Sequence, residues 1–141
     1  MGTANHLPAG ILPSGVDMAA INALATKYAL GISAIDDQHR LLFGWCVALR
    51  TAPAIQPVLQ ALLTYAITHF QDEERWALDH GVDIEAHHAQ HVELLQHLEE
   101  QLRRPKQSRM EAQAMAFDWL TQHIDVEDRN LVMAADLDRD D

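Results

Sequence analysis

The sequence predicts an all-α protein, an antiparallel up-down-up-down four-helix bundle with an N-terminal arm. Every clear apolar pattern repeats every three to four residues, and none alternates with the period of two that a half-buried strand needs. Prolines and glycines divide the patterned sequence into four segments with short connections. Amphipathic helices joined in this way typically pack as antiparallel neighbours in a bundle.

The composition is typical of one helical domain. The chain has 141 residues, 48% of them hydrophobic and 6% aromatic, which is enough for an aliphatic core. A net charge of −11 argues against nucleic acid and anionic membrane surfaces as partners and leaves small neutral ligands. The single cysteine, Cys46, excludes an internal disulfide, and no apolar run resembles a membrane span. We expect a soluble cytoplasmic protein, most simply a monomer.

The N-terminal half is expected to hold an arm and two core helices. Residues 1–27 form the arm, irregular where prolines and glycines cluster and with a short helix over 16–25. The first core helix begins at Asp36, a good N-cap, and runs to about Arg50. The second spans 58–79, with Gly81 as its terminator.

The C-terminal half is expected to hold the other two core helices. Asp83 can cap the third, which runs to about 103 before Pro105. Ser108 and Glu111 form a capping box that starts the fourth, which continues toward residue 128. The bundle domain therefore spans 28–131, and the acidic stretch 132–141 is expected to be a solvated tail.

Seven potential metal ligands are spread over these four helices. Six of them lie on the apolar stripe of their own helix, and two pairs are spaced by four residues, so that each pair shares one face. Burying so many unpaired polar groups would cost several kcal/mol each unless they satisfy one another, and a metal does this. Their donors exceed the needs of one ion, so we expect two. The seven residues are His39, His69, Glu73, His87, His91, His123 and Asp128.

The seventh residue conflicts with regular helix geometry. Asp128 follows His123 by five residues, which leaves the two side chains about 140° apart on an ideal helix. Glu127, at four residues, would fit an ideal helix better. Asp128 can be the ligand only if the helix is locally distorted or ends there, for example through a π-bulge.

Other polar and aromatic residues are given simpler roles. The remaining histidines are expected on the solvated surface: His6, His80, His88 and His97. Trp119 and Leu120 lie about one helical turn before His123 and could form the wall of a small cavity.

The ordered ligand set resembles that of the hemerythrins, in particular the single-domain bacteriohemerythrins. The surrounding segments also look like signatures of that family, and the likeness covers about residues 28–131. These segments are Gly31–His39, His69–Glu74, His87–His91, Trp119–Ile124 and His123–Asp128. Tyr28 departs from the family, where tryptophan is common at this place, and residues 1–25 have no counterpart in the minimal domain.

The resemblance implies reversible O2 binding, for transport, storage or delivery, at a non-haem di-iron centre and no enzymatic activity. Two iron ions per chain (Fe2+/Fe3+), bridged by an oxo or hydroxo group, would be the cofactor. By analogy one iron is held by His87, His91 and His123 and the other by His39 and His69, while Glu73 and Asp128 bridge them. The resemblance thus selects Asp128 over Glu127. Trp119, Leu120 and Ile124 would then be apolar walls of the O2 pocket.

Three other functions compete with O2 carriage. The same di-iron site could serve an O2 or redox sensor that contacts a partner protein through the arm. A ferritin-like di-iron oxidase would need four glutamates and two Glu-x-x-His pairs, and only Glu85 and His88 have that spacing. A structural zinc site would need only four ligands, and the His-Glu-x-x-His motif is absent.

Overall fold

The computed structural model describes residues 12, 15–104 and 108–139, with side chains described as far as Ala135. Within these ranges the chain is helical and contains no β-strand, in agreement with the predicted all-α class. The helices are α1 (Met18–Lys27), α2 (Ser33–Ala48), α3 (Ile55–Asp79), α4 (Glu85–Arg103), α5 (Arg109–Gln122), a π-helical segment (His123–Asp128) and α6 (Arg129–Arg139).

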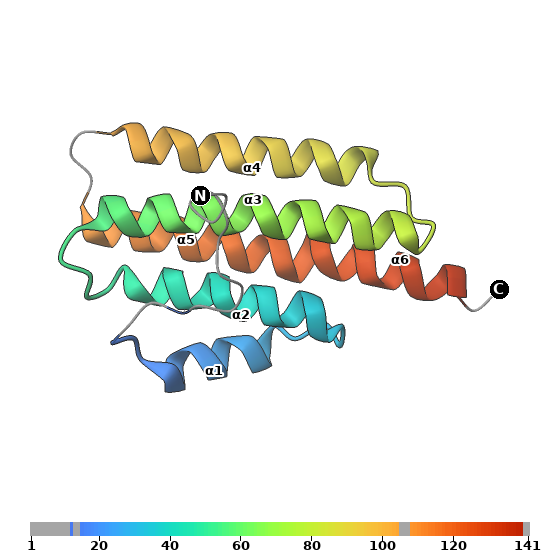
Figure 1. The fold of residues 1–141 in the computed structure, drawn as a ribbon, viewed down its shortest axis with the longest axis horizontal. Coiled ribbons are helices and arrows are strands. Elements are labelled where there is room, and N and C mark those ends of the chain that lie inside the picture. Colours follow the sequence, from blue (N-terminus) through green and yellow to red (C-terminus); the bar gives the residue numbers. More distant parts are fainter. Residues whose placement is uncertain (1–11, 13–14, 105–107, 140–141) are drawn as a thin grey trace, which may run out of the picture.

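The long helices form a bundle. Figure 1 shows α2, α3, α4 and the continuous rod of α5, the π-helical segment and α6 lying alongside one another, joined at alternating ends of the molecule. The short helix predicted within the arm is present as α1, which lies against α2. Its Ile21 is fully buried, so this part of the arm contributes to the core.

The start of α2 corrects the predicted N-cap. Asp36 lies inside the first turn, and Ile32 occupies the cap position. The Asp36 carboxylate accepts hydrogen bonds from the backbone N–H groups of Leu30 and Gly31, at 2.8 and 3.0 Å. It therefore fixes the loop before the helix, a function of an Asp side chain that competes with capping.

The ends of α3 combine one correction with one confirmation. The helix begins three residues before the predicted Val58, because Pro57 is tolerated in a first turn that needs no N–H donor. It ends at Asp79 as predicted, and Gly81, with φ 75°, is its terminator. The Gly81 N–H bonds to the Leu78 carbonyl and the Val82 N–H to the Ala77 carbonyl, the pattern of a Schellman motif.

The starts of α4 and α5 use the predicted acceptor side chains. Asp83 Oδ1 accepts from the Glu85 N–H at 3.1 Å, although the cap position itself is Ile84. Ser108 is the N-cap of α5, and its Oγ accepts from the Glu111 N–H at 3.0 Å.

The C-terminal stretch differs from the expected solvated tail. The rod continues as α6 to Arg139, and Val132 and Ala135 are buried. The prediction relied on the acidic composition of 132–141 and did not consider these two apolar residues. They lie three positions apart and so face the same side of a helix.

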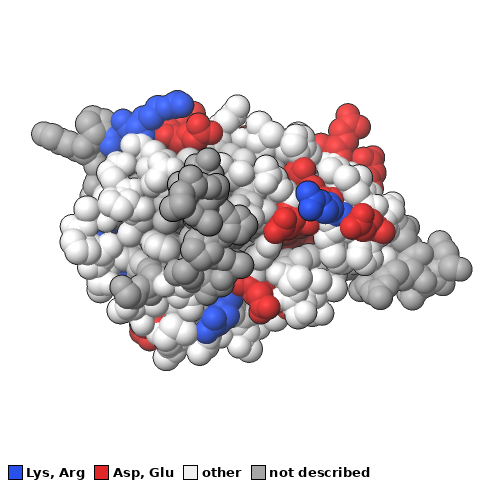
Figure 2. Space-filling model, in the orientation of Figure 1, with Lys and Arg blue, Asp and Glu red and all other residues white. Residues whose placement is uncertain are grey.

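The surface is mixed in charge. On the face drawn in Figure 2, lysine and arginine side chains lie beside acidic ones and do not merge into one basic patch. No helix of the described residues is long and apolar enough to cross a bilayer.

Candidate metal centre

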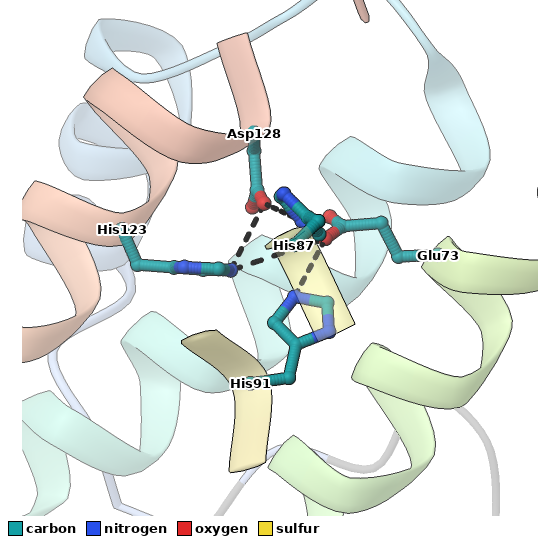
Figure 3. A group of neighbouring side chains, drawn as sticks. All are labelled: Glu73, His87, His91, His123 and Asp128. Carbon is teal, nitrogen blue, oxygen red and sulfur yellow. Dashed lines mark hydrogen bonds and ion pairs between the residues drawn. The ribbon is translucent and has the colours of Figure 1, made fainter. Parts of the chain in front are cut away.

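The structure brings together all seven residues predicted as metal ligands. Each is at most 8% exposed, and they come from α2, α3, α4 and the π-helical segment. Figure 3 shows five of them pointing at one another, with His87 and His91 on α4 and His123 and Asp128 on the π-helical segment. Such a concentration of buried donors is unusual because each loses its hydration.

Donor atoms in the cluster fall into two overlapping groups that suit a metal ion each. One group contains three histidines, His87, His91 and His123, and the other contains His39 and His69. Glu73 and Asp128 belong to both groups. Within each group, one donor atom from every residue lies within 4.8 Å of the others.

The Glu73 carboxylate divides its two oxygens between the groups. Its Oε1 lies 2.9 Å from His87 Nε2 and 3.2 Å from His91 Nε2. Its Oε2 lies 3.3 Å from His69 Nε2 and 3.9 Å from His39 Nε2. A carboxylate placed in this way can bridge two metal ions, one on each oxygen.

Asp128 has the same arrangement from the opposite side. Its Oδ1 lies 2.9 Å from His123 Nε2, and its Oδ2 lies 2.8 Å from His39 Nε2. His123 and Asp128 are the first and last residues of the π-helical segment, in which hydrogen bonds span five residues. The π-bulge on which the Asp128 assignment depended is therefore present. Glu127 lies outside both groups and is partly exposed.

Several central atoms have the character expected of metal donors. Within the described part of the chain, four atoms facing the centre lack a hydrogen-bond partner: Glu73 Oε2, Asp128 Oδ1, and Nε2 of His91 and His123. Buried polar groups without partners are rare in folded proteins. Two cations would satisfy all four, so the residues present fit a two-metal centre.

Without a metal, the carboxylates and imidazoles must neutralise one another. Burial and the Asp128 charge raise the pKa of Glu73. The imidazoles of His69 and His87 outweigh both effects and lower this pKa to about 2. Burial also raises the pKa of Asp128. The nearby His123 imidazole has the larger, opposite effect and holds this pKa well below its usual range. For His69, burial lowers the pKa, but the Glu73 and Asp128 carboxylates raise it to about 10.

The pKa values of His87 and His39 shift in opposite directions, because burial and the carboxylates act on each ring to a different extent. Burial lowers the pKa of His87, but hydrogen bonds to Asp128 and Glu73 raise it to about 9. For His39 the burial is decisive and its pKa is lowered. In the metal-free centre, the protonated forms of His69 and His87 and the ionised carboxylates of Glu73 and Asp128 therefore stabilise one another.

We expect the metal-free protein to be most stable between about pH 4.5 and pH 6.5. The raised pKa values of His69 and His87 contribute stability that is complete below pH 6.5 and is lost as pH rises toward 9 and 10. The lowered pKa of Glu73 contributes stability that is complete above pH 4.5 and is lost toward pH 2. Thermal unfolding of chelator-treated protein at each pH measures this. A melting temperature that stays constant from pH 6.5 to pH 10 would contradict the assignment.

Two consecutive side-chain hydrogen bonds orient His69, and the sequence analysis did not identify them. Its Nδ1–H donates to Gln38 Oε1 at 2.7 Å, and Gln38 Nε2 donates to Asp72 Oδ2 at 2.7 Å. Asp72 accepts only, so the Gln38 amide has one orientation and Nδ1 of His69 carries a proton. Nε2 of His69 is thereby left free to bind a metal.

Glu74 has the corresponding role for His91. Its Oε2 lies 2.7 Å from His91 Nδ1, and the carboxylate also lies 2.9 Å from Nδ1 of His88, whose side chain is 57% exposed. The sequence signal was the requirement that a metal-bound imidazole donate its second N–H to an acceptor. Helical periodicity could not say which acceptor, because Glu74 and His91 lie on different helices.

Glu74→Gln is expected to lower the affinity of the centre for its metals by about 10-fold, because substitutions of this type cost 10–100-fold. An amide oxygen still accepts from Nδ1 but raises the basicity of the imidazole less than a carboxylate does. The metal affinity of Glu74→Ala should be lower still. Metal affinity is measured by competition with a chelator, and His88→Ala, which removes only the exposed partner, is the matched control. Equal affinities in Glu74→Gln and the control would contradict this role.

The aromatic wall of the centre contains a residue that was not predicted. The ring of Phe70 stacks on His91, with ring centroids 3.9 Å apart and planes at 3°, and it contacts His123 edge-on at 5.1 Å. Trp119 packs against Phe70 and also lines a cavity that reaches His123. Leu120 and Ile124 are fully buried in the hydrophobic core and are not among the residues lining that cavity.

Comparison with protein families relates the chain to a known domain. The family model described as the hemerythrin HHE cation binding domain matches residues 30–135. No curated protein and no solved structure matches the chain. Because the matched region covers more than half of the chain and contains all seven buried donors, this protein belongs to the hemerythrin family.

Proposed function

We propose that this protein binds O2 reversibly at a centre of two iron ions held between four antiparallel helices. The supporting observation is the unequal donor set: one group offers five protein donors and the other offers four. Iron accepts about six donors in octahedral sites, so the group of His39 and His69 leaves more positions for an external ligand. When bound, the two irons would supply the electrons that hold O2.

The protein residues would control that chemistry in three ways. Glu73 and Asp128 would keep the irons close together, with one oxygen on each. Gln38 and Glu74 would fix the tautomers of His69 and His91. Phe70, which covers one face of His91 and contacts His123, would keep water from these two rings, which strengthens the electrostatic interactions inside the centre.

The donor set favours O2 binding over oxidase chemistry. Five imidazoles and two carboxylates make up the two groups, whereas ferritin-like oxidases hold their metals mainly with glutamates. An imidazole-rich set stabilises Fe2+ relative to a carboxylate-rich one, because additional negative charges favour the higher oxidation state. The use of the same centre as a sensor would also depend on reversible O2 binding.

The test is an O2 titration of iron-loaded protein. The chain is loaded with Fe2+ under anaerobic conditions, O2 is added in steps, and the absorption spectrum is recorded before and after purging with argon. We expect saturation at one O2 for each pair of irons and recovery of the starting spectrum. An irreversible change would favour an oxidase and contradict the proposal.

A further inference from the structure

A cavity of about 500 Å³ lies between α4 and the rod of α5 and the π-helical segment. Its walls carry the carboxylates of Glu93 and Glu100 from α4 and of Glu127 from the π-helical segment. His123, which belongs to the buried centre, lines the same cavity. The cavity therefore extends from exposed acidic residues on α4 to a buried metal-site histidine.

The acidic residues follow one face of α4. Glu93, His97 and Glu100 are spaced by four and three residues, so they lie above one another along about 10 Å of helix. Glu93 comes two residues after His91, and the row leads away from the centre toward solvent. Oxygen and imidazole donors in such a row suit a divalent cation that exchanges its water molecules in steps.

Buried polar atoms at the inner end lack partners. His123 and Trp119 both line the cavity and are each more than nine-tenths buried. In the described residues, His123 Nδ1 and Trp119 Nε1 have no hydrogen-bond partner. Figure 3 shows the His123 ring directed at Glu73 and Asp128, so a cation that reaches this ring is already beside the two bridging carboxylates.

We propose that this cavity is the route by which Fe2+ reaches the buried ligands. The inference rests on the proposed iron centre, because it names how that centre is filled. All seven ligands are at most 8% exposed, so the ion needs a path with replacement donors. A chain of net charge −11 attracts cations, and a cleft lined by carboxylates concentrates them. Glu127, next to Asp128 in the chain, is the last carboxylate before the centre.

The experiment measures the rate of Fe2+ uptake by metal-free protein under anaerobic conditions at low ionic strength. In Glu93→Gln/Glu100→Gln we expect the uptake rate to fall about 10-fold, the lower end of the effect of electrostatic steering. The final iron content should match that of the unmodified protein, because neither residue belongs to the donor groups. Glu93→Lys/Glu100→Lys should be slower still, and added salt should reduce both differences.

The matched control is Asp79→Asn/Glu85→Gln, which removes the same charge at the connection between α3 and α4, outside the residues that line the cavity. Its uptake rate should stay within about twofold of the unmodified protein. Equal slowing in the two double variants, or no slowing in either, would overturn the route. Failure of the proposed function is a separate result, because O2 binding could be irreversible in protein that still fills through this cavity.

Discussion

Asp128→Ala is expected to lose both irons, while Glu127→Ala keeps them at equilibrium. Asp128 offers Oδ1 at 2.9 Å from His123 and Oδ2 at 2.8 Å from His39, so its removal takes a donor from each group. Substitution of residues that merely orient a ligand costs 10–100-fold in affinity, so loss of a shared ligand should cost more than about 100-fold. Glu127 is absent from both groups.

The measurement is iron content per chain after anaerobic loading to equilibrium and removal of free metal. Circular dichroism of both variants shows whether the helices persist. The two substitutions remove the same charge at adjacent positions, so a difference between them reports on coordination rather than on net charge. Retention of iron by Asp128→Ala, with loss in Glu127→Ala, would show that the segment is a regular α-helix when metal is bound.

Removal of iron by a chelator is expected to lower the melting temperature by more than about 10 °C. The ligands come from α2, α3, α4 and the π-helical segment, so the unfolded chain has no preformed site and binding energy becomes folding energy. A metal present at 1,000 times its Kd adds about 4 kcal/mol of stability. For a chain of this length each kcal/mol corresponds to about 3 °C.

Thermal unfolding before chelation, after chelation and after return of Fe2+ measures this effect. Return of Mg2+ is the control, because Mg2+ prefers oxygen ligands and would not replace iron among five imidazoles. Equal melting temperatures for the loaded and metal-free protein would show that the centre does not hold the helices together.

The sequence alone predicted the helices and the composition of the centre. The period of three to four residues is a local property, and it placed six polar residues on the apolar stripes. All six, together with Asp128, are at most 8% exposed and lie together in the structure. Their coordination of iron stays a prediction until the metal content is measured.

Tertiary packing decided the features that connect one helix to another. Acceptors for the outer nitrogens of His69 and His91 are Gln38 and Glu74, and each lies on a different helix from its histidine. Phe70 stacks on His91 for the same reason: α3 and α4 pack at a register that no sequence period records. The burial of Val132 and Ala135 likewise depends on where the rod continues beyond the π-helical segment.

The contrast between Glu127 and Asp128 shows most clearly what helical periodicity cannot predict. Helical period alone favoured Glu127, and the resemblance to a family favoured Asp128. In the structure a π-helical segment brings Asp128 to 2.9 Å from His123 and leaves Glu127 on a cavity wall. Sequence determined which side chains face inward because that choice is made within one helix. Only the packed bundle decided the local hydrogen-bond register. The π-helical register costs free energy, and contacts with three other helices offset that cost.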